Sequence, residues 1–298
     1  MFERLKSILD DPPPAMAFEI SGAGVAAARI GARIELEFRP LKPGVLSVSP
    51  LKENVNDPDE FMAAVRAFAS AQSLRKRRDI ALILPDCAAR IAVLDFDRFP
   101  ADPGEQLSLV RFRMKRSVPF DVESAAVSYV AQPPGDQGNV DVVVVVAPVE
   151  IVARYEAPFR NVGWNPGLVT VSCLAALELA PDHDLDIMAK LSGCSLSVLV
   201  RRRGVLKLVR CLELPSNELD EIAAVLAPTL TYMEDNLGGR PEKLMLCGFG
   251  ERFDEARSRF QNEMGIDADF LRSPLGPPGE SNAGLLGYLR SIAGNSGK

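Results

Sequence analysis

The sequence predicts a mixed α/β protein of roughly two domains, and three observations lead to this prediction. The chain has 298 residues, and domains hold roughly 150 residues each. Apolar runs with strand character are interspersed with segments of helical periodicity along the chain. Three of the predicted strands end in glycine-containing turns, at residues 21–24, 192–195 and 248–250.

Composition excludes several classes of function. With 47% hydrophobic and 25% charged residues the chain is an ordinary globular protein, and a net charge of −6 argues against a general nucleic-acid binder. The longest apolar run, Val140–Pro148, is too short to cross a bilayer, and the charged first residues lack a signal peptide's apolar region. We therefore expect a cytoplasmic protein.

Cysteine and histidine usage narrows the chemistry further. The five cysteines are scattered without a C-x-x-C pair, which is typical of buried thiols in a reducing compartment. The chain has one histidine, His183, in a polar loop, so a Ser-His-Asp triad and a His-rich zinc site are excluded.

The first part of the chain predicts a β-meander followed by a helix. Residues 2–9 have the spacing of a short terminal helix, and the basic run at 75–78 reads as a solvated turn. Asp57 or Asp59 can cap a helix over 59–70. Strands are expected at 17–20, 24–30, 34–39 and 45–48.

The middle of the chain predicts a strand–helix–strand–strand unit that is α+β rather than Rossmann-like. The valines at 142–146 suit a strand covered on both faces. The expected strands are 80–84, 88–96, 127–131 and 140–147, and the expected helices are 103–116 and 148–161.

A corner ends the first of these two helices. Pro119 cannot continue a helix, and the cation of Arg116 suits a helix C-terminus. Phe120 and Asp121 follow and lead into the next strand. We expect Phe120 to pack in the core, so that its loss would reduce stability.

The C-terminal part predicts a second mixed unit. A long helix over 217–237 has an i, i+3, i+4 apolar stripe and ends at Gly238-Gly239. Further helices are expected at 174–179, 252–264 and 283–293. Strands are expected at 168–171, 186–191, 196–201, 205–212, 243–247 and 267–271.

The order of the three glycine turns resembles the actin-like ATPase fold. The first two turns open hairpins, and the third leads into a helix after a long helix. In that fold two related α/β halves face each other across a nucleotide cleft. The resemblance implies a first subdomain over 1–79, an inserted partner-binding subdomain over 80–164, a return to the first subdomain over 165–184, and a second half over 185–298.

Within this fold the chain is similar to the PilM-like family of type IV pilus assembly proteins. The family pattern is a strand ending in Leu-Pro-Gly, a second strand, an acidic helix ending in a Pro-Phe step, a valine-rich strand with Ala-Pro, and a late helix–GGRP–strand–glycine turn. The matching segments are ALILPDCAARIAVLDFDRFP, LVRFRMKRSVPFDVESAAVSYV, VDVVVVVAPVEIVARYEAPFRNVGWNP and EDNLGGRPEKLMLCGFGERF. FtsA and the cytoplasmic domain of the type II secretion L protein share the fold.

The nucleotide loops depart from the family pattern. The first loop's Asp has become Glu19, and its lysine position is Ala26. The second loop's Asp-Ile-Gly has become residues 188–190 or 190–192, and neither alignment keeps a carboxylate for Mg²⁺ or water. Phe249 replaces a glycine of the third loop. The resemblance implies nucleotide-loop positions at Glu19, Ser21, Gly22, Gly24, Ser192, Gly193, Gly248 and Gly250.

These departures favour a degenerate ATPase, since phosphoryl transfer needs cations around the phosphates and an acid that positions metal or water. We expect no catalytic residue, no metal and no required cofactor, although the fold leaves bound Mg-ATP open. The resemblance implies a scaffold, peripheral to the inner membrane, that binds the short cytoplasmic tail of a PilN-like bitopic protein and, more loosely, the pilus motor ATPases. In this interpretation Arg116, Pro119, Phe120 and Asp121 belong to the partner-binding subdomain.

Two alternatives remain open at this stage. The first is a nucleotide-binding ATPase that switches or polymerises, or a component like the type II secretion L protein. Glu19 and Lys190 are the residues that distinguish an active ATPase from a scaffold. The second is a small-molecule kinase, which requires a carboxylate in the interdomain cleft. Asp95, Asp97 and Asp141 fall instead in the inserted unit, where we expect solvated or strand-end roles.

Overall fold

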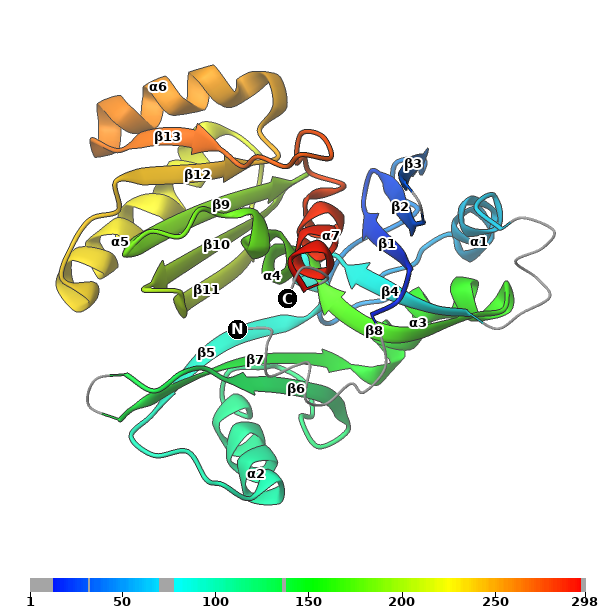
Figure 1. The fold of residues 1–298 in the computed structure, drawn as a ribbon, viewed down its shortest axis with the longest axis horizontal. Coiled ribbons are helices and arrows are strands. Elements are labelled where there is room, and N and C mark those ends of the chain that lie inside the picture. Colours follow the sequence, from blue (N-terminus) through cyan, green and yellow to red (C-terminus); the bar gives the residue numbers. More distant parts are fainter. Residues whose placement is uncertain (1–12, 32, 70–77, 136–137, 296–298) are drawn as a thin grey trace.

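The computed structural model describes residues 13–31, 33–69, 78–135 and 138–295, so the helix expected at 2–9 and most of the basic run at 75–78 lie outside the described residues. Within the described ranges the chain forms three β-sheets with helices packed around them (Figure 1). None of the helices described is both long and apolar enough to cross a bilayer.

The first sheet has five strands in the order β3-β2-β1-β4-β8. β1 pairs antiparallel with β2 and parallel with β4, β2 pairs antiparallel with β3, and β4 pairs parallel with β8. The bounds are β1 Met16–Ser21, β2 Gly24–Ile30, β3 Ile34–Pro40, β4 Arg78–Leu84 and β8 Trp164–Val171.

The strand expected at 45–48 is wrong, because only Leu46 forms a bridge, to Val55. The Val45 carbonyl accepts from the Asn56 amide and the Ser47 amide donates to the Asn54 carbonyl, both at 2.9 Å, and the pairing goes no further than this one bridge. Beyond it the buried Asn54 side chain accepts from the Ser49 amide at 3.0 Å and donates to the Ser49 carbonyl at 2.6 Å. A short polar side chain that bonds nearby backbone in this way favours a turn over a continued strand, and the segment is therefore a loop.

Helices α1 (Pro58–Arg66) and α3 (Val149–Asn161) pack on the first sheet around Phe18. The Phe18 ring lies 5.0 Å from the rings of both Phe159 and Trp164. Asp57 caps α1 by accepting from the Glu60 amide, as predicted. This aromatic cluster holds the outer helices to the central strand β1.

Two further helices meet beside β1: α4 (Ser172–Ala176), followed by a 3-10 turn (Leu177–Leu179), and the C-terminal α7 (Ala283–Asn295). They approach so closely that a Cβ atom on Gly287 would lie 2.0 Å from the Ala175 carbonyl oxygen. Only glycine fits at this crossing. The C-terminal helix is thereby brought to the centre of the molecule (Figure 1).

The second sheet repeats the order and strand senses of the first, as β11-β10-β9-β12-β13. Helices α5 (Leu219–Leu237) and α6 (Phe253–Met264) pack on it, and Gly238 ends α5 with a φ of +70°, as predicted. The strands are β9 Leu185–Ser192, β10 Ser195–Arg202, β11 Val205–Glu213, β12 Lys243–Cys247 and β13 Asp267–Phe270. The prediction of two related α/β halves is confirmed.

The third sheet is antiparallel, in the order β5-β7-β6, with helix α2 (Pro103–Met114) on one face. Alternate valines of β7 face α2 and the main core, so the valine run is covered on both faces, as predicted. The bounds are β5 Arg90–Phe96, β6 Ala125–Ala131 and β7 Val140–Pro148.

The predicted inserted subdomain, 80–164, therefore includes two elements of the first half. β4 lies between β1 and β8 because its apolar residues are buried on both faces, and α3 packs with α1. Between β4 and β5 lies a short 3-10 helix, η3 (Asp86–Ala88). The third sheet itself is formed by segments between Arg90 and Pro148.

The third sheet contacts the second half along β11. The Gln132 side chain, 2% exposed, exchanges two hydrogen bonds of 2.8 Å with the Leu206 backbone, as a neighbouring strand would. Asp141, which we expected in a solvated or strand-end role, lies at the start of β7, where it is buried rather than solvated and pairs with Lys207. β11 is an edge strand of the second sheet, and polar side chains of the third sheet bond to it where a further strand could pair.

Candidate functional site

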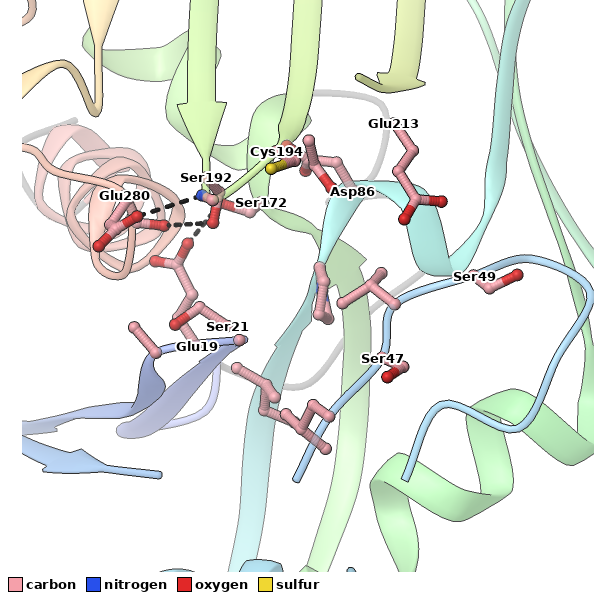
Figure 2. A pocket seen from close by; sticks show the side chains of 18 of the residues that line it. Glu19, Ser21, Ser47, Ser49, Asp86, Ser172, Ser192, Cys194, Glu213 and Glu280 are labelled. Carbon is pink, nitrogen blue, oxygen red and sulfur yellow. Dashed lines mark hydrogen bonds between the residues drawn. The ribbon is translucent and has the colours of Figure 1, made fainter. Parts of the chain in front are cut away.

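A cavity of about 770 Å³ lies where the two halves meet, and it is the candidate site (Figure 2). Its walls come from β1, from η3, from α4 and from the β9–β10 turn. The exposed acids Glu53, Glu213 and Glu280 lie around it, together with the exposed Lys52. The floor is formed by charged side chains that are almost completely buried.

The centre of this floor is an ion pair between the two halves. The Lys190 ammonium lies 3.0 Å from the Asp86 carboxylate, and the two side chains are 2% and 3% exposed. Lys190 reaches this position because β9 alternates: Ile187, Ala189 and Leu191 face the α5–α6 side, so Lys190 points to the opposite face. A charge here must be paired, since burial of an isolated charge is costly.

Asp86 accepts further hydrogen bonds from both halves. The Cys173 amide donates to one carboxylate oxygen at 2.6 Å, and the Ser197 hydroxyl donates to the other at 2.8 Å. Pro85 ends β4 immediately before Asp86 and starts η3, which places the carboxylate over α4 and β10. Its oxygens are therefore already used by protein donors.

Glu19 is the second buried acid, 1% exposed on β1. It accepts from the Ser172 hydroxyl (Figure 2) and, at 2.7 Å, from the Leu285 amide in the first turn of α7. Burial raises the pKa of the Glu19 carboxyl, while the Lys190 charge acts in the opposite direction. A helix N-terminus stabilises a carboxylate, yet desolvation outweighs these favourable contacts.

Lys190 itself stays charged. Burial on its own lowers the pKa of the ammonium, but the negative charges of Asp86 and Glu19 outweigh it, so the pKa lies above the usual value. One cation thus faces two acids. Protonation of Glu19 makes the cluster electrically neutral, which is the cheaper state in a buried site.

The first two glycine turns are held by contacts within the protein. The Ser21 hydroxyl donates to the Gly24 carbonyl at 3.1 Å and accepts from its amide at 3.2 Å, so it is used inside the turn. In the β9–β10 turn the Gly193 amide donates to the Glu280 carboxylate at 3.2 Å, and the Ser192 hydroxyl donates to the Glu280 carbonyl at 3.1 Å (Figure 2). The Gly193 amide, which could otherwise donate to a bound anion, therefore donates to a carboxylate of the protein itself.

The third turn is a packing feature of β12. A Cβ atom on Gly248, whose φ is +81°, would lie 1.9 Å from the Leu191 carbonyl oxygen. Gly250, with a φ of +52°, begins the 3-10 turn before α6. Phe249 is buried against Phe260. These residues lock the turn to β9, and they do not line the cavity.

The structure brings five of the eight predicted loop residues to the cavity wall, and these are Glu19, Ser21, Gly22, Ser192 and Gly193. Gly24 lies at the base of the first hairpin, where a Cβ atom would approach the Arg39 carbonyl oxygen to 2.3 Å. Sequence reasoning missed Asp86 and Glu280. Asp86 could have been recognised because it replaces the glycine of the family's Leu-Pro-Gly step. No feature of the sequence points to Glu280.

The corner residues of the inserted unit lie away from this cavity. Arg116, Pro119 and Asp121 are exposed, and Phe120 is partly buried against the core of the third sheet. The Asp121 carboxylate accepts from the Glu123 amide, and this hydrogen bond lowers its pKa.

Buried thiols near the cluster are poor nucleophiles. Cys173 and Cys211 approach to 4.0 Å between sulfur atoms. Burial raises the pKa of the Cys87 and Cys247 thiols to about 12, and it raises that of Cys173 well above its usual value. Since the thiolate is the reactive form, these three cysteines act as apolar packing at neutral pH.

The residues present do not fit a bound Mg-nucleotide. A hard divalent cation needs free oxygen ligands, but the oxygens of Asp86 and Glu19 already accept from Lys190, Ser172, Ser197 and two backbone amides. The exposed acids around the cavity would repel phosphates. The arrangement is instead suited to holding two halves of a protein together.

Comparisons with known proteins identify the fold. No protein-family model and no curated protein sequence matches the chain. A solved "PilM-PilN type IV pilus biogenesis complex" is similar with a TM-score of 0.76 and 20% identity, over 95% of this chain and 99% of that chain. A Bacteroides thetaiotaomicron protein with "actin-like ATPase fold and unknown function" gives a TM-score of 0.54 and 11% identity, over 93% and 95% of the two chains.

The cytoplasmic domain of EpsL, from the Vibrio cholerae type II secretion system, gives a TM-score of 0.48 at 14% identity, over 78% of this chain and 80% of that chain. The chain has the actin-like ATPase fold, and the predicted resemblance to PilM is confirmed at the level of the fold.

The raised pKa of Glu19 predicts a pH-dependent effect of Glu19→Gln. The protonated carboxyl is favoured in the folded state, so its contribution to stability is complete below the usual pKa of 4.5 and is lost as pH rises through the folded-state value. We expect the stability of the variant relative to wild type to increase across that window, as measured by urea unfolding at a series of pH values.

Glu35→Gln, which replaces an exposed carboxylate on β3, is the matched control. A Glu19→Gln stability difference that stays constant from pH 4 to pH 8 would contradict the assignment of a raised pKa to this carboxyl.

The ion pair predicts a large cost for Lys190→Met. Removing one partner leaves buried charge uncompensated, and we expect a loss of about 3–5 kcal/mol of unfolding free energy. Lys190→Met/Asp86→Asn should lose less than Lys190→Met alone, because the unpaired acid is gone. Denaturant unfolding measures all three values.

Lys42→Met is the control, since Lys42 pairs with Glu60 at the surface, where solvent screens the charges and such pairs contribute little to stability. Additive losses in the Lys190→Met/Asp86→Asn variant would mean that the two side chains do not depend on each other.

Proposed function

We propose that the protein is a non-catalytic scaffold of a type IV pilus inner-membrane assembly complex, and that it binds the short cytoplasmic tail of a PilN-like membrane protein. The observation that carries the proposal is the buried Lys190–Asp86 pair with Glu19 at the centre of the cleft. Similarity to a PilM–PilN complex along 95% of the chain supports the choice of partner.

The site supports a degenerate ATPase in two ways. The floor of the cavity places a lysine between the acids where phosphoryl transfer requires a metal or a water-positioning acid. The Glu280 carboxylate also accepts from the Gly193 amide of the second loop, an anion-binding position in this fold. In this proposal the eight predicted nucleotide-loop residues keep a structural role and bind no nucleotide.

We place the PilN-type tail between the first half and the third sheet. Each of these two units ends in an edge strand. β8 is the edge of the first sheet, and β6 is an edge of the third. An extended peptide can add to such an edge through backbone hydrogen bonds, with apolar side chains in shallow contacts. On β8, Val169 is 39% exposed and supplies an apolar contact beside the free backbone edge.

In this proposal the third sheet with α2, including the corner Arg116–Asp121, is the partner-binding subdomain inserted into the first actin-like half, and it extends from about Arg90 to Pro148. The protein is held at the inner membrane through its partners from the cytoplasmic side, and motor ATPases are secondary partners.

A second candidate is a nucleotide-binding switch of the same fold. The cavity of about 770 Å³ favours it, because ligand pockets occupy roughly 300–1,000 Å³. Binding measurements with the two ligands separate the candidates.

The scaffold proposal predicts that a synthetic PilN-type tail binds the full chain at tens of micromolar or tighter in isothermal titration calorimetry. Val169→Lys should weaken this binding about tenfold or more, because it places a charge in the apolar contact at the β8 edge. Leu212→Lys is the matched control, since Leu212 is 38% exposed on a strand of the other half.

Absence of binding by both PilN-type and L-protein-type tails would contradict the scaffold. A tail that binds with equal loss in both variants would place the groove elsewhere.

The same proposal predicts a flat thermal response to millimolar Mg-ATP. A ligand at 100 times its dissociation constant adds about 2.7 kcal/mol, which would raise the melting temperature by about 5 °C or more. We expect a shift within about 1 °C in differential scanning fluorimetry, because the buried acids accept from protein donors and the Gly193 amide donates to Glu280. A rise of the larger size would support the nucleotide switch instead.

A further inference from the structure

The outer face of α2 is a second surface that the tail-binding proposal does not use. α2 covers the side of the third sheet that faces away from the two halves, and it forms the far end of the molecule in Figure 1. Its inner face is fixed by Val110 and Met114, which are 0% and 1% exposed. The opposite face of the helix is therefore turned to solvent.

An aromatic residue projects from this face. Phe112 is 68% exposed, the most exposed of the large apolar side chains in the described part of the chain. Lys115, the C-cap, follows it at i+3 on the same side of the helix, and Arg116 comes directly after the helix end; both cations are exposed. The result is a protruding ring with two cations beside it.

Two further arginines, Arg111 and Arg113, precede and follow Phe112 in the sequence, and both are held in place by contacts beside α2. The Arg113 guanidinium lies 5.0 Å from the centre of the Phe96 ring and donates to the Asp95 carbonyl at 3.3 Å. Arg111 lies 3.6 Å from the Glu123 carboxylate. They add positive potential to a face whose geometry is set by packing beneath it.

At the C-terminal end of α2 the cations outnumber the acids, and the exposed Glu105 lies two turns earlier on the same side of the helix. Glu123 pairs with Arg111. The pKa of the Asp121 carboxyl is lowered mainly by its hydrogen bond from the Glu123 amide, and the nearby Lys115 charge adds a smaller effect in the same direction. Arg116 has no ion-pair partner among the described residues. The local charge is thus positive on a protein whose net charge is −6.

We propose that this face, Phe112 with Arg113, Lys115 and Arg116, docks directly on an anionic lipid surface. An aromatic ring enters the interfacial region of a bilayer while flanking lysines and arginines contact anionic headgroups. Each such cation raises partitioning onto an anionic surface about fivefold. This contact is made by the protein itself, and it stands or falls independently of the tail-binding proposal.

The shape of the face favours a lipid surface over an acidic peptide. A peptide needs a groove, and both cavities described for the chain lie elsewhere, at the cleft and beside β3 and α7. Phe112 projects outward from a helix instead. A flat, deformable, negatively charged surface complements a convex positive face.

Sedimentation with vesicles tests the proposal on the full chain at low ionic strength. Vesicles contain either phosphatidylcholine alone or phosphatidylcholine with phosphatidylglycerol. We expect binding only to the anionic vesicles and loss of binding as salt increases. Lys115→Glu/Arg116→Glu should lower the partition coefficient about 30-fold or more, and Phe112→Ala should lower it about tenfold, with Phe112→Trp restoring it.

Arg66→Glu/Lys243→Glu is the matched control, because it changes the net charge equally at two exposed cations on other elements. Equal loss by control and test variants would show a nonspecific charge effect and overturn the proposal. Absence of wild-type binding to anionic vesicles would overturn it as well. Retention of a poly-glutamate peptide without vesicle binding would assign the face to an acidic protein and overturn it.

Discussion

The Lys190 ammonium lies 3.0 Å from the Asp86 carboxylate at the point where the two halves of the fold meet. Burying this pair is tolerable only because each oxygen of Asp86 has additional donors, from the Cys173 amide and the Ser197 hydroxyl. Those donors come from α4 and β10, so the pair constrains both halves together. Glu19 extends the network to α7 through the Leu285 amide.

This network changes what the inherited cleft can do. An actin-like protein that works through nucleotide needs its acids free for a metal and its turn amides free for phosphates. Here Lys190 pairs with Asp86, the Ser172 hydroxyl and the Leu285 amide donate to Glu19, and the Glu280 carboxylate accepts from the Gly193 amide. We therefore propose that partners are met on surfaces outside the cleft: an extended tail at the edge strand β8, and an anionic membrane at the outer face of α2.

The general fold was predictable because its signals are local. The valine run of β7, the cap at Asp57 and the stop at Gly238 each follow from the preferences of a few neighbouring residues. The strand expected at 45–48 was wrong because its pairing with 54–56 stops at one bridge, next to which the Asn54 side chain bonds the Ser49 backbone. Lys190 was singled out only as a position that had lost an acid. Its partner Asp86 lies 104 residues away, and no local pattern reveals such a contact. The same holds for Glu280, whose role depends on the path of a late loop.

Hydrogen–deuterium exchange of the wild-type protein, with and without millimolar Mg-ATP, shows whether the buried pair closes the cleft to nucleotide. We expect the segments around Asp86, Ser172 and Lys190 to open only with global unfolding, since the buried pair ties both halves together. We also expect Mg-ATP to leave exchange at residues 20–24 and 191–196 unchanged. Fast exchange around Lys190, or slower exchange of these two turns when Mg-ATP is added, would contradict this expectation.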